Sequence, residues 1–136
     1  MIKPQKSFSY SALVVEDSHH YQLLLSKLLT TAGFDKLTVA ENGKIGLEKA
    51  QKSHPHLVLL DGIMPEMDGL TALQEMRTFL PQTVIIIISS LSDKEKITEF
   101  KNSGADLYLL KPFDNDKFFQ LIDKAITLIN ERLQKE

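Results

Sequence analysis

The stretch that decides the fold is Leu57-Val58-Leu59-Leu60-Asp61-Gly62-Ile63-Met64-Pro65-Glu66-Met67-Asp68-Gly69, in which an unbroken apolar run ends on a carboxylate. Four apolar residues without alternation, bounded by a proline-containing segment and by turn residues, are typical of a strand buried on both faces of a parallel sheet. Asp61 then lies at the carboxyl end of that strand. Ligands and reactive groups collect at this edge of open α/β sheets, because the loops that leave the strands converge there. Asp61 is therefore a candidate functional residue.

Apolar runs and amphipathic segments alternate along the rest of the chain. We expect the other strands at 12–15, 37–40, 84–88 and 106–110, and helices at 18–31, from 42 onward, 71–79, 93–102 and from about 115. Five strands that are each followed by a helix make a (βα)5 pattern, and right-handed crossovers turn this pattern into a doubly wound parallel sheet covered on both faces. We expect residues 1–10 to be a loose leader and residues 11–136 to form one α/β domain with a long C-terminal helix.

Composition and charge exclude several classes of protein. The 136 residues are 43% hydrophobic and 25% charged, which suits one compact domain. Lys and Arg number 16 against 18 Asp and Glu, so no overall field favours nucleic acid or an anionic membrane. Cysteine is absent, and no apolar run approaches the roughly 18 residues of a membrane span. These features predict a cytoplasmic domain that binds neither nucleic acid nor membrane directly.

Polar side chains stand where four of the predicted strands end. They are three carboxylates, a hydroxyl and an ammonium: Glu16, Asp17, Asp61, Ser89 and Lys111. Clustered carboxylates repel one another unless a hard cation neutralises them, and Mg²⁺ accepts one or two carboxylates while keeping sites for water and phosphate oxygens. An ammonium and a hydroxyl opposite the metal supply the charge and the hydrogen bond that a phosphoryl group needs. The pattern predicts phosphoryl transfer to a carboxylate, with Mg²⁺ as cofactor.

These residues, with the stretch Asp61-x-x-Met64-Pro65-x-Met67-Asp68-Gly69 and the pair Lys111-Pro112, resemble the receiver domain of two-component response regulators over about residues 11 to 130. The resemblance implies a flavodoxin-like fold with strand order 2-1-3-4-5. It also implies that Asp61 accepts a phosphoryl group from the phosphohistidine of a sensor histidine kinase or a histidine phosphotransfer protein.

The same resemblance assigns the metal ligands. Asp17 would bind Mg²⁺ directly, Glu16 mostly through water, Asp61 through its carboxylate, and Ile63 through its backbone carbonyl. Gly62 stands where a bulkier apolar residue is common in the family.

Further roles that the resemblance implies concern the phosphoryl group and the response to it. Ser89 and Lys111 would hold the phosphoryl oxygens, and Tyr108 would move inward when Ser89 moves toward them. The Lys111–Pro112 peptide would be cis. Phosphorylation would then be read on the face formed by the fourth helix, the fifth strand and the fifth helix, by an output domain or a partner.

The same residues argue against two other functions. A phosphohydrolase with an aspartate nucleophile needs a second Asp two positions on, where this chain has Ile63. A flavodoxin-like flavin carrier needs hydrogen-bond donors in its first loop, whereas Glu16 and Asp17 would repel a phosphate. We therefore expect a signalling domain that catalyses only its own phosphorylation and dephosphorylation.

The four histidines form two pairs. His19 and His20 are neighbours that point apart on a helix, and His54 and His56 flank a proline in a loop. We expect all four to be surface residues rather than metal ligands.

The closing helix carries apolar residues over half of its circumference. Five of them step by three and four residues, a coiled-coil spacing held for about two heptads: Phe119, Ile122, Ile126, Ile129 and Leu133. Two interpretations stay open. The residues either form a wide face against the domain's own sheet, or form a seam against a partner, which is an output domain or a second copy in a homodimer through the fourth helix, fifth strand and fifth helix.

Overall fold

The computed structural model describes residues 10–64 and 67–135. Its strands are β1 (Ser11–Val15), β2 (Lys36–Ala40), β3 (Leu57–Asp61), β4 (Val84–Ser89) and β5 (Leu107–Leu110). They form one parallel sheet in the order β2-β1-β3-β4-β5, which confirms the predicted fold. Most of the predicted leader, together with Pro65 and Glu66 of the motif, lies outside the described residues.

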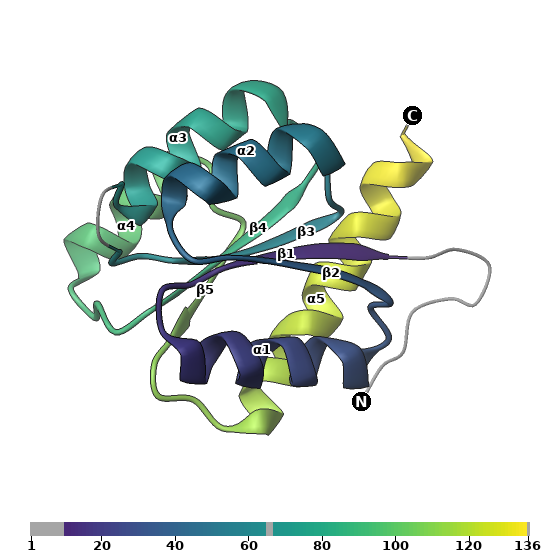
Figure 1. The fold of residues 1–136 in the computed structure, drawn as a ribbon, viewed down its shortest axis with the longest axis horizontal. Coiled ribbons are helices and arrows are strands. Elements are labelled where there is room, and N and C mark those ends of the chain that lie inside the picture. The colour runs from purple at the N-terminus through teal and green to yellow at the C-terminus, as the bar shows by residue number, and fades with distance from the viewer. Residues whose placement is uncertain (1–9, 65–66, 136) are drawn as a thin grey trace.

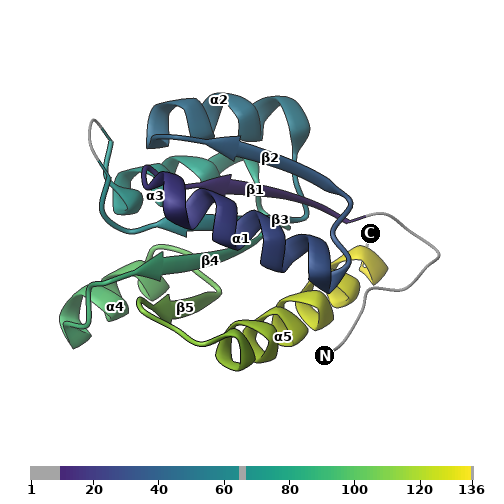
Figure 2. The same cartoon turned by 60° about the horizontal axis from the view of Figure 1, so that its bottom comes forward.

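Helices cover both faces of this sheet and make three layers (Figure 1). The helices are α1 (His19–Ala32), α2 (Gly43–Ser53), α3 (Gly69–Phe79), α4 (Lys94–Asn102) and α5 (Asn115–Gln134). Helices α1 and α5 lie on one face, and α2, α3 and α4 lie on the other (Figures 1 and 2). No helix within residues 10–64 and 67–135 combines the length and apolar character needed to cross a membrane.

The helix starts follow from local hydrogen bonds. The Ser18 side chain caps α1, and Gly33 ends it in the left-handed conformation that glycine permits, at φ 108°. Helix α3 begins at Gly69, two residues before the predicted start, because the Asp68 carboxylate accepts the N–H of Thr71 at 2.8 Å. Asp93 caps α4 by accepting the N–H of Glu95 at 3.0 Å. These caps fix the loops that leave the carboxyl ends of the strands.

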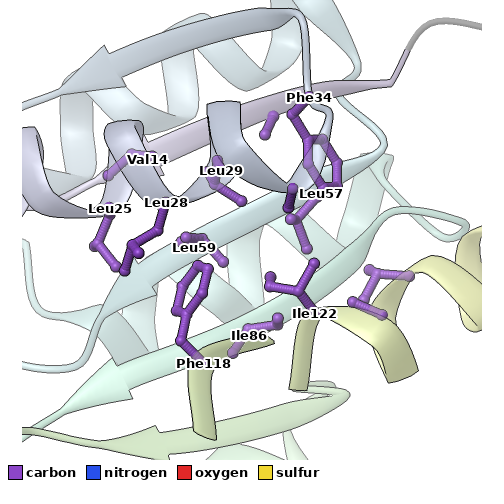
Figure 3. Packing of buried hydrophobic residues seen from close by; sticks show 14 of the residues in the cluster. Val14, Leu25, Leu28, Leu29, Phe34, Leu57, Leu59, Ile86, Phe118 and Ile122 are labelled. Atoms are coloured by element: carbon purple, nitrogen blue, oxygen red, sulfur yellow. The ribbon is translucent and has the colours of Figure 1, made fainter. Parts of the chain in front are cut away.

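Each face of the sheet has its own hydrophobic cluster. On the α1 and α5 side, side chains of both helices interdigitate with alternate residues of the strands, and Leu25, Leu29, Leu59, Phe118 and Ile122 meet there (Figure 3). On the other side, residues of α2 and α3 pack with Phe100 of α4. The apolar runs of β3 and β4 are buried on both faces, as their lack of alternation predicted.

The packing of helix α5 distinguishes between the two interpretations of its apolar residues. Ile122, Ile126 and Ile129 are 1%, 4% and 2% exposed and belong to the domain's own core. Phe119 and Leu133 are partly buried against the same cluster. The interpretation of a seam covered by a partner is therefore wrong for the three isoleucines, and the wide face packs on the sheet.

Charged residues fasten α3 and α5 to the amino end of β5. The Asp106 carboxylate accepts Arg77 Nη2 at 2.7 Å and Arg132 Nη2 at 2.6 Å, and it also accepts the backbone N–H of Ile85 at 2.9 Å. Strand β5 consequently begins at Leu107, one residue later than predicted. One carboxylate thus joins two helices and the sheet.

His56 departs from the expectation of a surface residue. It is partly buried, and its Nδ1 accepts the backbone N–H of Ser11 at 3.0 Å, while its ring lies perpendicular to that of Tyr10. His19, His20 and His54 are exposed, as predicted.

Candidate functional site

Three carboxylates meet at the carboxyl edge of the sheet. Val15 pairs with Leu60 in neighbouring strands, so the next residues, Glu16 and Asp61, come side by side. One oxygen from each of Glu16, Asp17 and Asp61 lies within 4.8 Å of the others. Glu16 and Asp61 are only 1% and 6% exposed, whereas Asp17 faces solvent. An oxygen-only donor set that is open to solvent on one side fits a hard divalent cation.

Lys111 reaches this cluster from the end of β5. Its Nζ lies 2.6 Å from Glu16 Oε1 and 3.6 Å from Asp61 Oδ2. The other Glu16 oxygen accepts the backbone N–H of Ser18 at 3.0 Å. The Lys111–Pro112 peptide is cis, as the resemblance implied. The ammonium thus bridges the two buried carboxylates.

The electrostatics of Asp61 follow from its position. Burial is the main cause that raises its pKa from 3.8 to about 7. The N–H of Ile63, which donates to Oδ1 at 3.1 Å, lowers this pKa, the charge of Glu16 raises it, and Lys111 lowers it. Near neutral pH the carboxylate therefore needs more positive charge than Lys111 supplies to remain fully ionised.

Ser89 and Tyr108 meet on the backbone of one residue. Buried Ser89 accepts the N–H of Leu91 at 3.2 Å through its Oγ, and the Tyr108 hydroxyl donates to the Leu91 carbonyl at 2.7 Å. Burial raises the pKa of the Tyr108 hydroxyl. Tyr108 also packs against buried Phe100 of α4, with ring centroids 5.9 Å apart. The hydroxyl and the aromatic ring that the sequence singled out are connected through the loop between β4 and α4.

Ile63 lies two residues after Asp61 and is 50% exposed. Its N–H contacts Asp61 as described above, and the metal role of its carbonyl stays a prediction.

Two glycines of the motif have a steric role that sequence reasoning missed. A Cβ at Gly69 would overlap the backbone oxygen of Asp61 and lie 2.7 Å from the Cα of Gly62. A Cβ at Gly62 would lie 2.8 Å from Ser89 Oγ. The signal was present, since glycine stands at both ends of the turn that follows the acceptor strand, but the close approach itself appears only in three dimensions.

We expect Gly69→Ala to lower the free energy of unfolding by about 1–3 kcal/mol, because a methyl group there must displace the backbone at the end of β3. Urea denaturation measures the change. Thr71→Ala in the same helix, where the side chain is exposed, is the matched control and should stay within about 0.5 kcal/mol of the parent. Equal stability of the Gly69→Ala variant and the parent would show that this packing is looser than described.

Comparison with known proteins agrees with this geometry. The family model of the response regulator receiver domain matches residues 12–123. Chemotaxis protein CheY of Bacillus subtilis is 32% identical over 118 residues, covering 87% of this chain and 98% of the relative. Regulatory protein AtoC of Escherichia coli is 35% identical over 91% of this chain, which spans only 26% of that longer protein.

Solved structures share the fold. Chemotaxis protein CheY4 of Vibrio cholerae superposes with a TM-score of 0.81 at 28% identity, covering 87% of this chain and 99% of that one. The CheX–CheY complex of Borrelia burgdorferi with BeF3 and Mg²⁺ contains a chain with a TM-score of 0.81 at 28% identity, covering 85% of this chain and 87% of its own. The chain therefore belongs to the response regulator receiver domains, the phosphorylation-controlled signalling domains of two-component systems.

Proposed function

We propose that this chain is a phosphorylation-activated switch in which Asp61 accepts a phosphoryl group from the phosphohistidine of a sensor histidine kinase or a histidine phosphotransfer protein. The observation that carries the proposal is the Lys111 ammonium 3.6 Å from Asp61 Oδ2, beside two further carboxylates. In the transfer the P–N bond of the donor breaks and a P–O bond to an Asp61 carboxylate oxygen forms. The electron pair of the P–N bond stays on the imidazole nitrogen, and the ring leaves as neutral imidazole because its other nitrogen carries the proton. The domain then acts on itself rather than on a separate substrate.

Mg²⁺ is the cofactor that the donor set favours. Asp17, Glu16, Asp61 and the carbonyl of Ile63 would hold it. When bound, the ion neutralises charge on the carboxylates and on the incoming phosphoryl oxygens. Asp17 is the exposed member of the cluster, so the ion and the donor would reach the site from its side.

Lys111 and Ser89 complete the site by binding phosphoryl oxygens. The Lys111 ammonium would exchange Glu16 for a phosphoryl oxygen, and it needs only a small movement because it already lies beside Asp61. The Ser89 hydroxyl would release the N–H of Leu91 and donate to another phosphoryl oxygen.

Movement of Ser89 would change the conformation of the face formed by α4, β5 and α5. The N–H of Leu91 would lose the Ser89 hydroxyl as its acceptor, which changes the loop that also holds the Tyr108 hydroxyl. Exposed Leu110 at the end of β5 belongs to this face. We propose that an output domain, a partner or a second copy of the chain reads this face, and that residues 11–136 act as one receiver domain that ends in α5.

Labelling by a small phosphodonor tests the site. Incubation with acetyl phosphate and Mg²⁺ should increase the mass of the protein by one phosphoryl group. The increase should vanish in Asp61→Asn and in excess chelator, and it should persist in Asp35→Asn, which makes the same change at an exposed position. Equal labelling of the Asp61→Asn variant would overturn the proposal.

Beryllofluoride tests the switch separately. Adding it with Mg²⁺ should change amide chemical shifts mainly over residues 89–115, because Ser89 and Tyr108 share Leu91. Chemical-shift changes confined to the loop after Asp61 would mean that binding at the site does not alter the conformation of the face formed by α4, β5 and α5.

A further inference from the structure

The Lys111 ammonium has an aromatic partner as well as its two carboxylates. Nζ lies over the ring of Tyr21, 4.1 Å from its centroid. Tyr21 is in the first turn of α1, where its backbone N–H donates to the capping Ser18. A cation at this distance over a ring face is attracted by the ring quadrupole, and the attraction is stronger where water is scarce. The Lys111 side chain is only 12% exposed, so the contact is largely desolvated.

Neighbouring rings hold Tyr21 in place. Phe113, two residues after Lys111, lies with its ring centroid 6.2 Å from that of Tyr21. Phe113 in turn stacks on buried Phe118 of α5 at 5.8 Å. The ring of His20 also contacts that of Tyr21, with centroids 5.2 Å apart and the two planes at 77°. The ring is therefore braced by α5 and by the loop that carries Lys111.

The three partners of the ammonium have different roles in the proposed reaction. Glu16, at 2.6 Å, is also needed as a metal ligand, and Asp61, at 3.6 Å, is the acceptor itself. Both carboxylates change their partners when a cation and a phosphoryl group arrive. The ring of Tyr21 is neutral, binds no metal, and can keep its contact throughout. It attracts the ammonium without competing for the phosphoryl oxygens.

We propose that Tyr21 is a positioning residue for the phosphoryl transfer, whose ring keeps the Lys111 ammonium beside Asp61 when Glu16 releases it. This inference rests on the function proposed above for Asp61 and Lys111. The ring face carries the effect, and the Tyr21 hydroxyl does not.

Variants that separate the ring from its volume test the inference. Tyr21→Phe keeps the face, whereas Tyr21→Leu and Tyr21→Met fill the space without it. With acetyl phosphate and saturating Mg²⁺, the labelling rate of Tyr21→Phe should stay within about twofold of the parent, and the other two should fall about 5- to 30-fold. Circular dichroism shows whether each variant is folded. If Tyr21→Leu does not fold, Tyr21→Met provides the same test.

Two further readouts exclude a merely structural role. In a Lys111→Met background, Tyr21→Leu should cause no additional slowing, because the ring acts through the ammonium. The ε-methylene protons of Lys111 should show an upfield ring-current shift in the parent and in Tyr21→Phe, and this shift should be lost in Tyr21→Leu. The shift is measured without any phosphodonor, so it reports the contact independently of labelling.

The outcomes distinguish the two proposals. A parent that labels on Asp61, with Tyr21→Leu and Tyr21→Met labelling as fast as Tyr21→Phe, overturns the role of Tyr21 and leaves the proposed function intact. Equal slowing by Tyr21→Leu with and without Lys111 also overturns it. A parent that never labels overturns the proposed function, and the role of Tyr21 falls with it.

Discussion

Asp106→Ala is expected to lower the free energy of unfolding by about 3–5 kcal/mol, since breaking a buried ion pair leaves the partner charge uncompensated. The Asp106 carboxylate accepts hydrogen bonds from both Arg77 and Arg132, and both arginine side chains are mostly buried. Burial already lowers the pKa of Arg77, which the charge of Asp106 opposes. Without Asp106, two like charges from α3 and α5 face each other, and the N–H of Ile85 loses its acceptor.

Chemical denaturation measures the loss, with Asp35→Ala as the control at an exposed position. The loss of unfolding free energy in Asp106→Asn should lie between the losses in Asp106→Ala and Asp35→Ala. The amide oxygen of the asparagine still accepts one hydrogen bond, while the charge is gone. Asp106 lies at the amino end of β5, so labelling of the folded variant by a phosphodonor should continue. A loss below about 1 kcal/mol for Asp106→Ala would mean that the arginines find other partners without cost.

Asp61→Asn is expected to stabilise the metal-free domain at pH 8 by up to about 4 kcal/mol, from 1.36 kcal/mol for each unit between pKa 3.8 and about 7. The folded state raises the pKa of Asp61, so the stability contributed by its protonated form is complete below pH 3.8 and is lost as pH rises through 7. Asparagine stays neutral at every pH, so the Asp61→Asn variant does not lose this stability as pH rises. The difference should therefore shrink toward pH 4.

Denaturation in chelator across pH 4 to 9 measures the free energy of unfolding of the parent and of Asp61→Asn. The free energy of unfolding of the control variant Asp35→Asn should change with pH as that of the parent does. Mg²⁺ should then stabilise the parent at pH 8 more than the Asp61→Asn variant, because an ion that binds only the folded site raises its stability. A stability difference between the Asp61→Asn variant and the parent that stays the same from pH 4 to pH 8 in chelator would contradict the raised pKa.

The sequence predicted the edge of the sheet well because its signals are local. An apolar run that stops on Asp61, and another that stops on Ser89, place both residues at strand ends before any contact is known. Parallel pairing then brings Glu16 and Lys111 to the same edge. The start of α3 was predicted two residues too late, because the hydrogen bond from the Thr71 N–H to the Asp68 carboxylate already caps the helix at Gly69.

Contacts between distant segments carried no such signal. Tyr21 and Lys111 are separated by most of the chain, and an aromatic residue on an amphipathic helix looks like core from sequence alone. The spacing of Ile122, Ile126 and Ile129 likewise fits both a coiled-coil seam and a wide core face. Only the packing on the sheet separates these interpretations.

The most direct test of the central claim locates the phosphoryl group on the chain. After incubation with acetyl phosphate and Mg²⁺, borohydride should reduce the acyl phosphate to homoserine, and peptide sequencing by mass spectrometry should find homoserine at position 61. Reduction at another carboxylate, such as Asp17, or labelling that resists borohydride because it resides on a serine or histidine, would contradict the assignment of Asp61 as the acceptor.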